Sequence, residues 1–307
     1  MTLAIYSHSA CLEHLLLPGH PESPDRLRAV LAALDDQRYA ALPRIDAPMA
    51  TREQLARVHS AELIETILDG PDLPYRQLDP DTAMTRGSAH AALRAAGAVC
   101  AAIDQVMISD VRRAFCAIRP PGHHATANSA MGFCLFNSVA VGAAHALAAH
   151  DLTRVAIMDF DVHHGNGTQD IFWSDPRVLY ASTHQSPLYP GSGQRDEHGS
   201  AGNIVNAPLP SGAGSGEFRR AMESIVLPEL DAFAPELLLV SAGFDAHRLD
   251  PLANLNLEAD DYGWVTARLV AMAERHCAGR IVSSLEGGYS LAALRQSTHA
   301  HVDALLR

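Results

Sequence analysis

The second half of the chain alternates short apolar runs with longer segments of helical pattern, and this alternation restricts the fold more than any other feature. The apolar runs lie at residues 114–118, 154–158, 178–182, 236–241 and 280–285, and the helical segments lie at 136–150, 215–232, 258–277 and 291–306. Strands that alternate with helices predict an α/β fold with a mostly parallel central sheet and helices on both faces. No linker or internal repeat divides the chain, so we expect residues 1–307 to form a single domain.

Polar motifs follow four of these runs, at the point where each predicted strand ends. The motifs are Arg119-Pro-Pro-Gly-His-His124, Asp159-Phe-Asp-Val-His-His-Gly-Asn-Gly167, Ala242-Gly-Phe-Asp-Ala-His247 and Glu286-Gly-Gly-Tyr289. The carboxyl ends of parallel strands lie on one edge of a sheet, where ligands bind in such folds. We therefore expect the four motifs to meet in space, although they are far apart in the sequence.

The second motif contains a candidate metal site. Asp161 and His163 are two residues apart, so in an extended segment their side chains leave the backbone on the same side. A carboxylate and an imidazole suit Zn²⁺, and Asp245 of the third motif supplies a third ligand while leaving a fourth position open. A lone aspartate after a strand is often only a helix cap, but the joint occurrence of these motifs at successive strand ends favours a metal site.

The other motifs contain groups that hydrolysis requires. His123 and His124 can act as acid and base. Tyr289, on a Gly-Gly turn, can donate a hydrogen bond to a developing oxyanion. Together with the metal ligands, these residues predict a hydrolytic enzyme.

Composition disfavours several other classes of protein. The formal net charge of −12 argues against a nucleic-acid ligand, which needs a basic surface, and is compatible with a cationic substrate. No apolar run approaches the roughly 20 residues of a membrane-spanning helix, and no signal peptide is evident, so we expect no membrane partner. The five cysteines have no CxxC spacing, which favours reduced thiols and a cytoplasmic location.

At this point the chain resembles the histone deacetylase superfamily, which includes bacterial acetylpolyamine amidohydrolases and is related to arginase-like metal enzymes. The resemblance covers most of the chain and is closest to the class II branch. The matching stretches are GHPESPDR (19–26), RPPGHH (119–124), MGFCLFN (131–137), DFDVHHGNGTQDIF (159–172), SAGFDAHRLDPL (241–252) and EGGYSL (286–291).

The resemblance implies a catalytic role for each motif. The zinc ligands of the family match Asp161, His163 and Asp245. The general base of the family matches His124, and the histidine that assists it electrostatically matches His123. The oxyanion donor matches Tyr289. The two partners that orient the histidine rings match Asp159 and Asn166.

The resemblance also implies where substrate, product and a second ion lie. The residues assigned to substrate binding, most of them walls of a narrow acyl-lysine tunnel, are Gly132, Phe133, Tyr189, Leu252 and His20. Arg26 matches an arginine near an internal channel for acetate release. A structural monovalent cation, usually K⁺, matches a site formed by backbone carbonyls of Asp159, Asp161 and His163 together with Ser182 and Thr183.

The activity implied is amide hydrolysis with one catalytic Zn²⁺, which releases acetate and a free amine. We expect the substrate to be an acetylated lysine in a peptide or protein, or a similar small N-acetylamine. An acetylpolyamine substrate is the first alternative. In polyamine-selective relatives a glutamate follows the Asp-Pro pair in the loop after the last metal ligand. In this chain Leu252 follows that pair, Asp250-Pro251.

Two further alternatives are less favoured. Members of the family that act as weakly catalytic binding modules for acyl-lysine carry histidine at the position of Tyr289, which is retained here. A binuclear manganese ureohydrolase typically has a further carboxylate at the position of Gly165, and glycine cannot ligate a metal. The oligomeric state is left open.

Overall fold

A parallel sheet of eight strands forms the centre of the computed structural model, which describes every residue except Met1 and Asp72. Asp72 belongs to the 71–80 segment, which the sequence predicts to be a loop, and lies outside the described residues. Every pair of neighbouring strands in this sheet is parallel. Across the sheet the strands lie in the order β2 (Arg44–Asp46), β1 (Thr2–Ser7), β5 (Val111–Cys116), β10 (Ile281–Leu285), β9 (Leu237–Ala242), β6 (Val155–Asp159), β7 (Val178–Gln185) and β8 (Ile204–Leu209).

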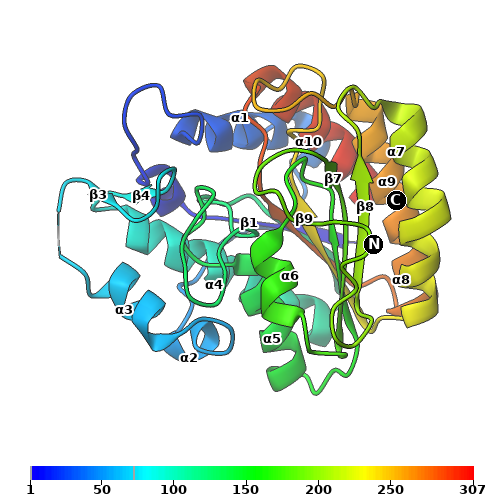
Figure 1. The fold of residues 1–307 in the computed structure, drawn as a ribbon, viewed down its shortest axis with the longest axis horizontal. Helices are drawn as coiled ribbons and strands as arrows, with labels where there is room; N and C mark the ends of the chain where they lie inside the picture. The colour runs from blue at the N-terminus through cyan, green and yellow to red at the C-terminus, as the bar shows by residue number, and fades with distance from the viewer. Residues whose placement is uncertain (1, 72) are drawn as a thin grey trace.

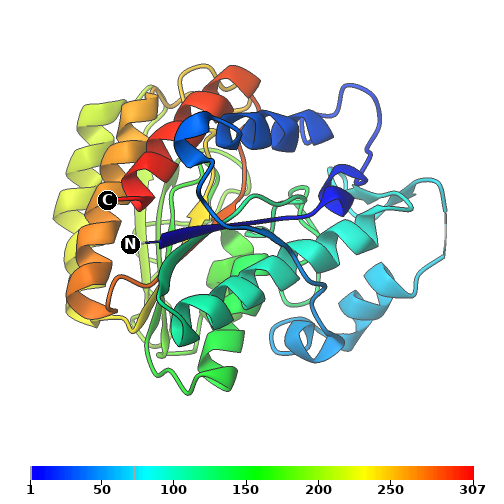
Figure 2. The same ribbon diagram turned by 180° about the vertical axis from the view of Figure 1, so that it is seen from behind.

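Helices cover both faces of the sheet (Figures 1 and 2). One face carries α1 (Pro24–Leu34), α7 (Ser215–Ala221), α8 (Leu227–Phe233), α9 (Ala259–His276) and α10 (Leu291–Leu305). The other face carries α4 (Ser88–Ile108), α5 (Ser138–Ala149) and α6 (Asn166–Phe172). The predicted α/β fold with helices on both faces is therefore confirmed.

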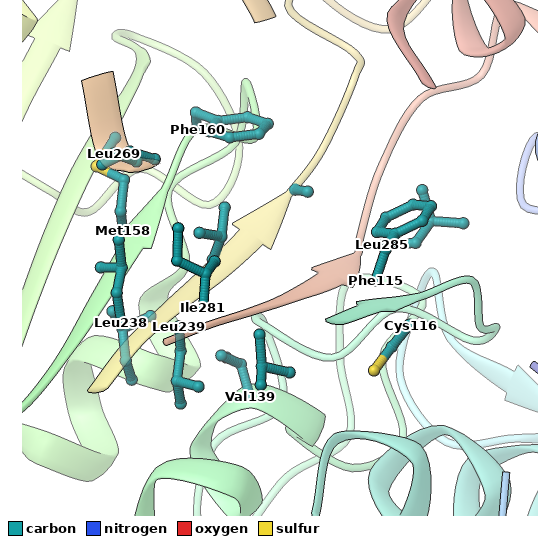
Figure 3. Close-up of a cluster of buried hydrophobic side chains, with 14 of the residues drawn as sticks. Phe115, Cys116, Val139, Met158, Phe160, Leu238, Leu239, Leu269, Ile281 and Leu285 are labelled. Carbon is teal, nitrogen blue, oxygen red and sulfur yellow. The ribbon is translucent and has the colours of Figure 1, made fainter. Parts of the chain in front are cut away.

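The main hydrophobic core fills the space between the sheet and these two helical layers. Figure 3 shows it around β5, β6, β9 and β10, with Val139 from α5 and Leu269 from α9 among the buried side chains. Strands covered on both faces need apolar side chains at consecutive positions. This requirement explains the apolar run Leu237–Val240 of β9, a strand in which every residue is buried.

The element boundaries differ from the sequence prediction in the first third of the chain. The capping-box pattern Thr51-Arg-Glu-Gln54 predicts one helical region at 51–68. The structure has two helices there, α2 (Arg52–Leu55) and α3 (Ala61–Leu68), because Ser60 caps a second helix by accepting a hydrogen bond from Leu63 N at 3.2 Å. Strand β2 was not predicted, since it is a three-residue edge strand without an apolar run. A small hairpin of β3 (Arg76–Gln77) and β4 (Ala83–Met84) begins inside the 71–80 segment, which the sequence predicts to be a loop.

A second difference lies in the predicted helix at 215–232. Its α-helical hydrogen bonding is interrupted between α7 and α8 by a π-helical turn at Met222–Val226, and the turn is followed by Pro228 at the second residue of α8. Proline lacks a backbone N–H, so the regular helical pattern cannot pass through it unchanged.

Helix α4 is long and apolar enough to cross a membrane by length and composition, but 61% of its most apolar stretch is buried inside the fold. It packs against α5 and β5. A Cβ atom added at Gly97 would lie only 2.1 Å from the carbonyl oxygen of Pro48, so the chain passes directly over this helix. Its apolar character is therefore accounted for by its place in the core.

Candidate active site

The four polar motifs meet at the carboxyl edge of the sheet. They follow β5, β10, β9 and β6, which are consecutive neighbours in the sheet. Asp159 is the last residue of β6, and Glu286 comes directly after β10. The side chains that the sequence placed at strand ends are thus brought together as predicted.

Three potential metal ligands converge at this edge. His163 Nδ1 lies 3.2 Å from Asp161 Oδ1 and 3.2 Å from Asp245 Oδ2, and one ligand atom from each residue lies within 4.8 Å of the other two. Both aspartates are buried. Two buried carboxylates and one imidazole, all directed at one point, fit a divalent metal ion such as Zn²⁺.

Backbone groups hold the two carboxylates in place. Asp161 Oδ2 accepts a hydrogen bond from Gly287 N at 2.8 Å, and Asp245 Oδ1 accepts one from Val162 N at 2.8 Å. A Cβ atom at Gly287 would lie 2.0 Å from Asp245 Oδ2, and one at Gly243 would lie 2.0 Å from Asp161 Oδ2. The glycines are required because the backbone approaches the carboxylates more closely than any side chain permits.

His123 lies behind the metal-ligand cluster and is paired with a carboxylate. Its Nδ1 is 2.9 Å from Asp159 Oδ2, which also accepts a hydrogen bond from the Tyr180 hydroxyl at 3.1 Å. Burial opposes a charge on this ring, but the carboxylates of Asp161 and Asp159 raise the pKa of His123 to about 10. A Cβ at Gly165 would lie 2.3 Å from Asp159 Oδ2, so this pairing excludes any side chain at position 165.

His124 has a different partner and a different charge state. Its Nδ1 lies 2.8 Å from the Asn166 side-chain oxygen, which accepts hydrogen bonds, so Nδ1 carries the proton and Nε2 is free to accept one. Burial, followed by the charges of His123 and His163, holds the pKa of His124 well below its usual range. The pKa values of the two adjacent histidines are therefore shifted in opposite directions.

A pocket of about 190 Å³ leads to these groups. The predicted substrate residues Gly132, Phe133, Tyr189 and Leu252 all line it. His20 does not line the pocket; instead its ring packs edge-on against Phe133 with the centroids 4.8 Å apart. The other lining residues are Asp81, His124, His163, Leu188 and Tyr289.

Tyr289 also lies on a charged cluster beneath the pocket. The Arg26 guanidinium lies 4.7 Å from the centre of the Tyr289 ring, and its Nε donates a hydrogen bond to the Gly288 carbonyl at 2.6 Å. The Tyr289 backbone N–H donates to Asp250 Oδ2 at 2.7 Å. Burial raises the pKa of the Tyr289 hydroxyl well above its ordinary value, so this group remains a hydrogen-bond donor.

The residues predicted to hold a monovalent cation lie on β6, on the neighbouring strand β7 and in the loop that follows β6. Asp159 of β6 is paired in register with Ser182 of β7. The Ser182 hydroxyl lies 2.9 Å from His184 Nδ1. The Thr183 hydroxyl is buried and has no hydrogen-bond partner among the residues that the structure describes. Because side chains alternate along a strand, this hydroxyl leaves β7 on the face opposite to that of Ser182.

Several buried charged groups of the site were not singled out from the sequence. Glu286 Oε2 accepts hydrogen bonds from Gly122 N at 2.6 Å and His123 N at 3.2 Å, which connects two of the motifs. Glu22 forms a buried ion pair with Arg119. All of these residues lie within the matching sequence stretches, so the signal was present. Asp81, which accepts a hydrogen bond from Gly132 N at 2.9 Å, lies outside them.

The arrangement is that of a known family. A family model described as the histone deacetylase domain matches residues 20–305, which is nearly the whole chain, so the protein belongs to the histone deacetylase family. This finding confirms the resemblance seen in the sequence. The members of this family are generally metal-dependent, in agreement with the convergence of Asp161, His163 and Asp245.

Individual relatives agree with this assignment. The chain is 41% identical over 277 aligned positions to the histone deacetylase-like amidohydrolase of Pseudomonas aeruginosa, covering 89% of this chain and 73% of that protein. It is 36% identical over 355 aligned positions to type-2 histone deacetylase 2 of Dictyostelium discoideum, covering 99% of this chain but only 21% of that protein. A crystal structure of the HDA15 HD domain superposes with a TM-score of 0.94 at 37% identity, covering 99% of this chain and 88% of that one. These names support a hydrolytic deacetylase.

Proposed function

We propose that this protein is a zinc-dependent amidohydrolase that removes acetyl groups from N-acetyl-lysine side chains or similar N-acetylamines. The observation that carries the proposal is the position of His124, whose Nδ1 is bound to Asn166, beside three convergent metal ligands at a pocket of about 190 Å³. The products would be acetate and a free amine.

The residues suggest how the reaction proceeds. His124 Nε2 accepts a proton from the attacking water and later delivers it to the leaving amine. The positive charge of His123 and the hydroxyl of Tyr289 stabilise the negative charge that develops on the carbonyl oxygen. A Zn²⁺ ion held by Asp161, His163 and Asp245 would supply a Lewis acid that polarises the scissile carbonyl.

Tyr289→Phe tests this mechanism. Removing one oxyanion donor typically costs about 10²–10³-fold in kcat, and we expect a loss of that order while bound zinc is retained. The two quantities to measure are kcat on an acetyl-lysine peptide and the metal content of the same sample. A kcat close to that of the wild type would remove Tyr289 from the mechanism.

The pocket favours a slender acyl-amine chain. Leu188, Tyr189, Phe133 and Leu252 provide apolar walls for the methylene groups of lysine. An acetylpolyamine is a second candidate, because the carboxylate of Asp81 lies in the pocket wall and would attract a second amine.

Measuring kcat/KM for acetyl-lysine peptides and for acetylpolyamines, side by side on zinc-loaded protein, distinguishes these candidates. We expect the peptides to be the better substrates. A clear preference for acetylpolyamines would support the second candidate. Negligible turnover of both by folded, zinc-loaded protein would point to a binding module for acyl-lysine.

We also propose that K⁺ occupies the site between β6 and β7. The pairing of Asp159 with Ser182, in register on these adjacent strands, supports this proposal. Replacing K⁺ in the buffer by tetramethylammonium, which is too large to enter, should lower the Tm of the wild type. The Tm of Ser182→Ala should respond less, and equal responses would argue against a role for the Ser182 hydroxyl.

A further inference from the structure

A second group of metal-ligating side chains lies away from the candidate active site, between α4 and the end of α5. Asp104 belongs to α4, His145 to α5, and His150 is the C-cap residue of α5. The Nε2 atoms of His145 and His150 lie 2.7 Å and 2.8 Å from the same oxygen, Asp104 Oδ1. One ligand atom from each residue lies within 4.8 Å of the other two.

The burial of the two histidines distinguishes this group from an ordinary surface ion pair and resembles that of a metal site. The side chains of His145 and His150 are only 8% and 14% exposed, so the fold already holds both rings in position. The rings lie nearly perpendicular, at 83°, with their centroids 6.0 Å apart. Asp104 is 45% exposed, which leaves an open side for an ion to enter and for water to complete its coordination.

We propose that Asp104, His145 and His150 bind a divalent transition-metal ion of the Zn²⁺ type, in addition to any ion at the catalytic site. Two imidazoles and a carboxylate are ligands that Zn²⁺ accepts, with water in the remaining position. In the metal-free protein the Nε2 atoms of both rings lie beside Asp104 Oδ1. A bound ion would take the place of the hydrogens between these nitrogens and that oxygen. A bound ion would connect α4 to the C-terminal end of α5 and stabilise the folded state by mass action.

Arg57 opposes this binding. Its Nη1 lies 2.8 Å from His145 Nδ1. Because a guanidinium only donates, His145 Nδ1 is unprotonated and Nε2 carries the hydrogen that Asp104 accepts. Metal binding at Nε2 requires the proton on Nδ1 instead, where it would face the Arg57 donor. The Arg57 side chain must therefore turn away from His145 and toward Glu53, whose Oε1 lies 3.3 Å from Arg57 Nη2.

Because Arg57 opposes metal binding without contacting the ion, replacing it should raise the affinity of the site for Zn²⁺. In Arg57→Gln the side-chain oxygen can accept the Nδ1 hydrogen of His145. Partners of this kind typically change metal affinity by about 10–100-fold. We expect Arg57→Gln to bind Zn²⁺ at least about tenfold more tightly at this site.

The test measures the number of zinc ions bound per chain. Tag-free, full-length protein is dialysed to equilibrium over a series of free Zn²⁺ concentrations, and bound zinc is counted by elemental analysis. We expect His150→Gln and Asp104→Asn each to bind one ion fewer than the wild type. His276→Gln is the matched control, because His276 pairs with Asp231 at 2.8 Å in a similar contact but no second histidine belongs to that group; it should keep the wild-type count.

Two results would overturn the proposal. One is an unchanged zinc count in both His150→Gln and Asp104→Asn. The other is the absence of tighter binding in Arg57→Gln, a variant that retains all three ligands and so remains informative if the other two fold poorly. The readout is a difference of one ion per chain, which is independent of deacetylase activity and of whether the catalytic site is filled.

Discussion

At the scale of the residue, the candidate metal site leaves no space for a side chain at the glycines beside its carboxylates. Gly287 has no side chain and its N–H reaches Asp161 Oδ2, while the space where its Cβ would lie is taken by Asp245 Oδ2. Gly165 is excluded from carrying a side chain by Asp159 in the same way. Gly165, which argues against a second catalytic metal, is therefore also required for steric reasons.

Gly287→Ala should disable the site without unfolding the protein. The added Cβ would lie 2.0 Å from Asp245 Oδ2, so this carboxylate must move out of the position in which it meets His163 and Asp161. We expect loss of bound zinc together with at least about a hundredfold loss of kcat, since misplaced catalytic groups typically cost this much. Elemental analysis and steady-state kinetics measure the two effects.

The control is Gly216→Ala in α7, where an added Cβ meets nothing within 4 Å. This change should leave zinc and kcat unaltered and stabilise the helix by up to about 1 kcal/mol. Full zinc occupancy in Gly287→Ala would contradict the steric argument.

At the scale of the element, a buried ion cluster joins the loop before α1 to the loop after β5. Arg119 donates to both carboxylate oxygens of Glu22, at 2.5 and 2.6 Å, and Arg26 donates to the same carboxylate at 3.1 Å. His14 Nε2 lies 3.5 Å from Glu22. Because Arg26 also contacts the Tyr289 ring, this cluster supports the floor of the pocket.

Glu22→Gln should destabilise the protein by about 3–5 kcal/mol near neutral pH, because it leaves a buried guanidinium without its counter-ion. Burial opposes ionisation of Glu22, but the Arg119 guanidinium holds its pKa at about 2, below the ordinary 4.5. A depressed carboxyl pKa stabilises the folded state fully above the ordinary value, and this contribution is lost as pH falls from about 4.5 toward 2.

The difference in unfolding free energy between wild type and Glu22→Gln should therefore shrink at acid pH. Urea denaturation at neutral pH and below pH 4 measures it. Asp25→Asn, which removes an exposed partner of Arg28, is the control and should change stability by no more than about 1 kcal/mol. A difference that does not depend on pH would show that the charge of Glu22 is not the cause.

A set of hydrogen bonds also holds the loop after β7, and this loop carries Tyr189 to the pocket. Glu197 Oε2 accepts hydrogen bonds from Gln169 Nε2 at 2.6 Å and from Gly193 N at 3.0 Å. His184 Nε2 lies 2.9 Å from the Gly193 carbonyl. Glu197→Ala should loosen this pocket wall and raise KM severalfold with a smaller effect on kcat, whereas Asp196→Ala, next to it and exposed, should change neither. Equal kinetics for both variants would mean that the loop is held by other contacts.

At the scale of the whole molecule, the net charge of −12 creates a field that attracts cations. Screening shortens its reach from about 30 Å at 0.01 M salt to about 3 Å at 1 M. For acetyl-lysine peptides flanked by lysine or arginine, kcat/KM should fall steeply as salt is raised. Peptides with neutral flanks should respond little, and identical salt dependence for the two kinds of peptide would exclude steering by the overall charge.

The sequence by itself determined the features that depend on local pattern. The alternation of apolar runs and helical segments predicts the parallel sheet, since periodicity is a local property. The spacing of Asp161 and His163 brings two ligands to one side of a strand end, because side chains alternate along an extended chain. Motifs of this specificity also identified the family.

Only the tertiary structure decided which of these groups meet. It made β5, β10, β9 and β6 neighbours, an order that no local pattern contains. It paired Glu22 with Arg119 across 97 residues of sequence, and it brought His145 and His150 to Asp104 on another helix. Such contacts depend on how whole elements pack, so their partners become visible only when the chain is folded.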